Sequence, residues 1–175
     1  MINYDNLIKY RNEFLRYAFK TCDSFSLVFN TDITYVDGYI DGREKAHIDL
    51  KPYLIEQYKA GKPMICNNVH WVSKKTVLNR YRCCKATREL IMAFKGVFDF
   101  EQTLDWGEPC DINFYRGEKS WFGSVYHEND AGFYSDGLII CESMTVSDID
   151  FLDGLNLLTV SADKCKDIIN SRKNK

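Results

Sequence analysis

The sequence predicts an α+β fold in which N-terminal helices pack on an antiparallel β-meander and short helices follow at the C-terminus. Three observations lead to this prediction. The first twenty residues have helical periodicity, short aromatic and β-branched runs separated by turn residues begin near residue 97, and no linker or repeat divides the chain. A chain of 175 residues buries roughly 70% of its extended surface around one core. We therefore expect a single domain over residues 1–170.

The N-terminal segment begins with an amphipathic helix, expected over residues 4–21, because its apolar side chains recur at intervals of three and four. Residues 24–30 then alternate between two faces. Phe25, Leu27 and Phe29 lie on one of them, which is the period of a β-strand.

The middle of the chain predicts further helices. One is expected from about residue 50 to residue 60, since Asp49 can cap it and Pro52 suits its first turn. Residues 62–75 show neither period clearly and predict a loop that can include a short strand. Residues 77–84 fit either a strand or the start of a helix that continues to Phe94.

The meander is predicted from four aromatic or β-branched runs. They are residues 97–100, 111–115, 120–127 and 131–134. A turn at Arg116-Gly117-Glu118-Lys119 places the second and third runs at hairpin distance, so we expect these two to pair.

The C-terminal segment predicts a short helix capped by Thr145 or Ser147, followed by a possible strand over residues 157–160. A last helix is expected over residues 162–169. Beyond it, residues 171–175 are expected to form a disordered basic tail.

The composition excludes several classes of function. A net charge of -2 gives no broad positive field, so nucleic acid is not expected as a partner. No apolar window is long enough for a membrane span and the N-terminus lacks a signal-peptide pattern, so we expect a cytoplasmic protein with no membrane partner. The seven cysteines have no C-x-x-C spacing and the three histidines stand alone, which predicts reduced thiols, no metal and no cofactor.

Two adjacent thiols and a histidine are the candidate catalytic residues. Cys83 and Cys84 lie among basic side chains that can lower a thiol pKa, and His127, oriented by Asp130, can act as a general base. In a strand the two cysteines would point to opposite faces, so only one could serve. The interpretation we favour is that the cysteines are structural and that His127 lies in a polar turn.

Two charged segments are candidate binding surfaces. A basic run, made of Arg80, Arg82, Lys85 and Arg88, could bind an anion or an acidic partner, although such runs are commonly solvated faces. The second is an acidic loop around Trp106 that suits a protein-binding edge. Its residues are Glu101, Asp105, Trp106, Glu108 and Asp111.

Two stretches, residues 76–94 and 113–128, resemble a family of small uncharacterised proteins from Gram-positive bacteria. Some members carry the label stage III sporulation protein AH. With the N-terminal helix, the resemblance covers most of the chain. It implies no active-site residue, because the shared motifs are not catalytic signatures.

The sequence therefore predicts a non-catalytic cytoplasmic protein-binding domain, with an immunity or regulatory role as one concrete form. No phosphate-loop, dinucleotide, serine-hydrolase or zinc-protease signature is present. The alternative is a small hydrolase or transferase that uses Cys83 or Cys84 with His127.

Overall fold

The protein has helices and a six-stranded antiparallel sheet, which confirms the α+β prediction. The computed structural model describes residues 2–30, 46, 48–59, 76–94, 97–98, 110–125, 130–133 and 140–173. Its helices are α1 (Tyr4–Lys9), α2 (Arg11–Thr21), α4 (Lys85–Ala93), α5 (Val146–Gly154) and α6 (Ala162–Lys173). The strands are β1 (Ser24–Asn30), β2 (Leu54–Lys59), β3 (Thr76–Arg82), β4 (Cys110–Arg116), β5 (Lys119–Val125) and β6 (Asp130–Gly132).

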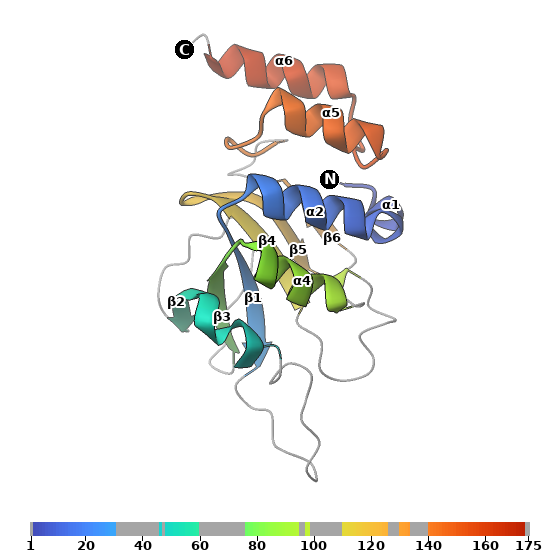
Figure 1. The fold of residues 1–175 in the computed structure, drawn as a ribbon. Helices are drawn as coiled ribbons and strands as arrows, with labels where there is room; N and C mark the ends of the chain where they lie inside the picture. The colour runs from blue at the N-terminus through green and yellow to red at the C-terminus, as the bar shows by residue number, and fades with distance from the viewer. Residues whose placement is uncertain are drawn as a thin grey trace.

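The strands follow the order β2-β3-β1-β4-β5-β6, and every neighbouring pair is antiparallel. The last three strands form the predicted meander, and the hairpin of β4 with β5 is confirmed. Its turn contains Gly117 at φ +56°, a conformation that an L-side chain rarely adopts. Figure 1 shows α2 and α4 in front of the sheet, while α5 and α6 form a hairpin beyond α2.

The N-terminal helix is interrupted once. Tyr10 leaves the helical conformation with φ -105° and ψ 25°, so the predicted helix over residues 4–21 is divided into α1 and α2. Asn3 caps α1 by accepting a hydrogen bond from the Asn6 N–H at 3.1 Å. The predicted strand over residues 24–30 is confirmed as β1.

The predicted helix over residues 50–60 is wrong. After Leu50 the chain makes a single 3₁₀ turn (η1, Lys51–Tyr53) and continues as the edge strand β2. Pro52 does begin a helical turn, but pairing with β3 fixes the conformation of the residues that follow. Gln57 strengthens that pairing by donating from Nε2 to Asn79 Oδ1 at 2.9 Å. Cross-strand pairing has outweighed the local helix signal.

For residues 77–84 the sequence allowed either a strand or the start of a helix. The structure has a strand over most of them and a helix immediately after them. β3 ends at Arg82, and α4 begins at Lys85 with Cys84 as its N-cap. Cys83 and Cys84 therefore lie just beyond the strand, although the extended backbone of Cys84 still directs adjacent side chains to opposite sides.

Three smaller expectations were also wrong. Val97 and Phe98 are buried but belong to no strand, and Phe98 instead packs against Phe14 with ring centroids 5.7 Å apart. Within residues 157–160, only Leu158 forms a β-bridge, and its partner is Ile2. α6 continues to Lys173, beyond the expected start of a disordered tail, and Arg172 donates hydrogen bonds to the carbonyls of Ile140 and Cys141.

The core lies between the sheet and the helices and is mainly aromatic. The register of β4 and β5 shifts at Trp121, since Phe114 is opposite Phe122 while Tyr115 is opposite Ser120. This irregularity allows both Trp121 and Phe122 to face Phe14 of α2, with centroid distances of 5.9 and 4.7 Å. None of the described helices is long and apolar enough to cross a membrane.

Candidate functional site

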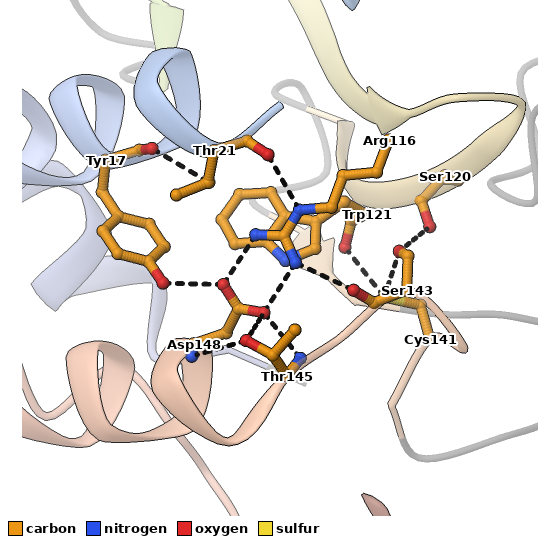
Figure 2. Close-up of polar contacts among 9 residues, drawn as sticks. All are labelled: Tyr17, Thr21, Arg116, Ser120, Trp121, Cys141, Ser143, Thr145 and Asp148. Atoms are coloured by element: carbon orange, nitrogen blue, oxygen red, sulfur yellow. Dashed lines mark hydrogen bonds and ion pairs between the residues drawn. The ribbon is translucent and has the colours of Figure 1, made fainter. Parts of the chain in front are cut away.

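The most connected buried polar cluster joins β4 to α5, and Asp148 is at its centre (Figure 2). Thr145 begins α5 as its N-cap, and a reciprocal capping box places Asp148 one turn into the helix. Arg116, the last residue of β4, binds both carboxylate oxygens of Asp148 at 2.6 and 2.7 Å. This bidentate geometry is the strongest arrangement available to an arginine and a carboxylate.

Arg116 and Asp148 make further contacts within the cluster. Arg116 donates to the carbonyl of Thr21 at 3.1 Å and to that of Ser143 at 2.8 Å, and its guanidinium lies 4.9 Å from the centre of the Trp121 ring. Tyr17 of α2 donates its hydroxyl to Asp148 at 2.7 Å. Figure 2 shows these side chains converging on the carboxylate from separate elements.

The protonation states fit an ion pair. Burial opposes ionisation of Asp148, but the hydrogen bonds from Arg116 and Tyr17 outweigh it and lower the pKa of the carboxyl. Burial, and then the hydrogen bond to Asp148, raise the pKa of Tyr17. The cluster therefore has the character of a structural anchor that holds α2, α5 and the β4–β5 hairpin together.

Cys84 is the more reactive of the two predicted thiols. It is partly exposed at the N-cap of α4, where its sulfur lies 3.5 Å from the Thr87 hydroxyl. Burial is the largest single effect on this thiol and raises its pKa, but hydrogen bonds from Thr87 and from the first backbone amides of the helix together outweigh it and lower the pKa of Cys84. At neutral pH a larger fraction of this thiol is therefore ionised than in an ordinary cysteine.

Cys83 has the opposite character. Its side chain packs against the hydrophobic core, and burial raises its pKa. The neighbouring thiol of Cys22 raises the pKa of Cys83 further. The sequence treated the two adjacent cysteines as equivalent candidates, whereas the helix start makes them different.

The sheet order separates one predicted catalytic residue, Asp130, from the two cysteines. β6, which begins at Asp130, is four strands away from β3, and with about 4.8 Å between neighbouring strands this separates the two by roughly 19 Å. Asp130 and Cys83 or Cys84 thus do not belong to one site. His127 lies outside the described residues.

The predicted acidic loop is described only at its end. Glu101, Asp105, Trp106 and Glu108 lie outside the described residues. Asp111 is part of β4, has φ 55° and is only 7% exposed.

The basic run does not form one surface. Arg80 is buried and binds Ser24 Oγ at 2.8 Å, the Gly117 carbonyl at 2.5 Å and Glu118 at 3.1 Å. Arg82 and Lys85 are exposed. Among the described residues, no group of three or more metal-ligating side chains could hold an ion.

An exposed apolar segment, which no sequence pattern predicted, precedes and includes the start of β2. Ile48 is 57% exposed, Leu54 38% and Ile55 53%, and these are the large exposed hydrophobic side chains of the described chain. We call these three residues the edge patch. The predicted helix over residues 50–60 obscured it, although β-branched Ile55 and Pro52 are equally typical of an edge strand.

Comparisons with known proteins give no match. No protein-family model matches the sequence, no curated protein matches it, and no solved structure matches the fold. Functional inference therefore depends on the geometry described above.

Asp148→Ala is expected to destabilise the protein by about 3 kcal/mol or more, because it leaves the largely buried Arg116 without its counter-ion. Urea unfolding followed by circular dichroism measures the change. Asp153→Ala, an exposed site on the same helix, is the control and should unfold close to wild type. Equal losses for both variants would contradict the anchoring role.

Cys84 should react with iodoacetamide at pH 7 faster than the other described cysteines, because more of its thiol is ionised and accessible. Mass spectrometry of the intact chain follows the reaction. Cys84→Ser, which keeps a good N-cap, should remove the fast phase, and Cys83→Ser should keep it. A fast phase that survives in Cys84→Ser would show that the reactive thiol is elsewhere.

Proposed function

We propose that this chain is a non-catalytic cytoplasmic protein-binding domain of an immunity or regulatory kind. The observation that supports it best is the edge patch, since three large aliphatic side chains stay exposed within eight residues. Burying one such side chain contributes about 1.5–3 kcal/mol. The three side chains are already partly covered, so a partner would gain roughly half of this contribution from each.

The position of the patch at the sheet edge indicates how a partner could bind. Among the described strands, β2 pairs with β3 alone, so the outer backbone groups of β2 face away from this sheet. An irregularity in the pairing between Leu54 and Glu56 leaves Glu56–Lys59 as the regular stretch of edge. A partner with an extended apolar segment can add hydrogen bonds along this edge while its side chains cover Leu54 and Ile55.

Two further proposals come from the sequence. The acidic loop around Trp106 remains a proposed second contact surface that would select a basic partner. We also propose a relationship with the small Gram-positive proteins that the chain resembles, from which no functional residue is transferred.

A second candidate function, a small cysteine-dependent hydrolase or transferase, is favoured by one observation. Cys84 combines partial exposure with a lowered pKa, as nucleophilic thiols do. Asp130 cannot assist it across the sheet, so a base near Cys84 would have to come from another residue. Turnover-dependent labelling of Cys84 by a substrate would support this candidate over the binding domain.

Ile55→Ser should weaken binding of the partner by more than about 1 kcal/mol while leaving the melting temperature unchanged, because the side chain is already half exposed. The partner is first captured from the native host on the immobilised full chain and identified by mass spectrometry. Its affinity is then measured by calorimetry for wild type, for Ile55→Ser and for Glu89→Ser, an exposed control on α4. A purified partner that binds all three equally would remove the edge patch from the interface.

Trp106→Ala should likewise weaken association by more than about 1 kcal/mol with the fold intact, since a central aromatic side chain often dominates an interface. The same calorimetric assay applies, together with a thermal melt. A sharp fall in melting temperature would instead place the indole in the core and end its assignment to the binding surface.

A further inference from the structure

Two cysteines distant in sequence lie at the junction where β1, β3, α2 and α4 meet. Cys22 directly follows α2, and Cys83 directly follows β3. The helices run antiparallel, because Arg11 at the start of α2 donates hydrogen bonds to the carbonyls of Ile91 and Met92 at the end of α4. The end of α2 therefore lies beside the start of α4.

The backbone fixes how close these two cysteines are. β1 and β3 pair in register up to Ser24 and Arg82, and one residue further the Cys83 N–H still donates to the Asp23 carbonyl at 2.8 Å. Asp23 is therefore opposite Cys83, and Cys22 is the residue next to Asp23. This offset of one residue along neighbouring strands places the Cα atoms of Cys22 and Cys83 about 6 Å apart. This value lies inside the range of about 4.4–6.8 Å found for disulfides.

The bend at Asp23 turns both thiols to the same side. The Asp23 carbonyl is bonded to β3, whereas its N–H donates to the Tyr115 carbonyl of β4 at 3.0 Å. In a regular strand the two groups of one residue point to the same neighbour, so the chain twists here. Cys22 consequently belongs to the hydrophobic core against which Cys83 also packs.

Cys84 is excluded as a partner of Cys83. Its backbone is extended, with φ -155° and ψ 176°, and adjacent side chains of an extended chain point to opposite sides. Cys22 is also near enough to Cys83 to raise the pKa of the Cys83 thiol.

We propose that Cys22 and Cys83 form an oxidation-sensitive dithiol that a small-molecule disulfide, such as oxidised glutathione, converts to an internal disulfide. Cys83 is the less buried of the two thiols, so it reacts first: after losing its proton, its thiolate attacks one sulfur of the small disulfide, forms a mixed disulfide and releases one small thiolate. The thiolate of Cys22 then attacks the Cys83 sulfur, forms the Cys22–Cys83 bond and releases the second small thiolate. The two protons lost by the protein thiols go to the two released thiolates, so the protein is oxidised and the small disulfide is reduced.

The internal disulfide would connect the end of α2 to the end of β3. Thr21, the residue before Cys22, accepts a hydrogen bond from Arg116, so the connection would adjoin the anchor around Asp148. Because it closes a loop of about sixty residues, it would raise the thermal stability of the oxidised chain.

The test equilibrates the full chain in buffers with different ratios of oxidised to reduced glutathione, blocks free thiols and maps the disulfide by mass spectrometry. Trypsin leaves Cys83 and Cys84 on one peptide, so the mapping is repeated on Cys84→Ser and Cys83→Ser. The expected result is a linkage to the Cys22 peptide in wild type and in Cys84→Ser, its loss in Cys83→Ser, and a higher melting temperature for the oxidised wild-type chain.

Two results would overturn the proposal. One is a chain that shows no Cys22 linkage at any glutathione ratio, including the fully oxidised one. The other is a linkage that persists in Cys83→Ser and disappears in Cys84→Ser, which would assign the pair to Cys22 and Cys84. A circular dichroism melt of each reduced variant confirms that it is folded before the mapping.

Discussion

The buried ion pair between Arg116 and Asp148 is the interaction on which the joining of helices and sheet depends. Arg116 ends β4 and Asp148 lies in the first turn of α5, so the pair connects two elements that are far apart in sequence. Neither charge can stay in this interior without the other, because the desolvation of a single buried ion costs several kcal/mol. Tyr17 adds α2 to the same carboxylate, and its ring stacks on Phe151 of α5 with centroids 3.8 Å apart. One carboxylate thus fixes the relative positions of three layers.

The edges of this assembly carry the features that suggest function. The anchor around Asp148 directs its polar groups toward one another, which agrees with a structural role rather than chemistry. By contrast, the edge patch exposes apolar surface beside β2, which is an edge strand among the described residues. Cys84 exposes a thiol at a helix start. A rigid interior with an apolar, hydrogen-bonding edge is well suited to a binding module, because little order has to be gained when a partner docks.

The junction of α2 with β1 shows how the same backbone serves stability and chemistry. Asp23 bonds to β3 through its carbonyl and to β4 through its N–H, and its side chain accepts a hydrogen bond from the Gly117 N–H at 2.7 Å. This bend holds the hairpin turn, brings Cys22 into the core and sets it beside Cys83. If the two thiols at this junction were oxidised to a disulfide, the new bond would connect α2 and β3, which already lie side by side there.

The sequence by itself determined the elements whose signals are local. Periodicity predicted β1 and the N-terminal helical segment, turn residues predicted the β4–β5 hairpin, and Thr145 was one of two predicted caps for α5. Tertiary structure decided what depends on partners distant along the chain. Residues 54–59 became a strand because β3 offers hydrogen bonds there, which no local propensity encodes. The ion pair between Arg116 and Asp148 could not be predicted, since neither residue has an unusual sequence context and only folding brings them together. The edge patch and the closeness of Cys22 to Cys83 were hidden for the same physical reason: exposure and proximity are properties of packing, and packing depends on the whole chain.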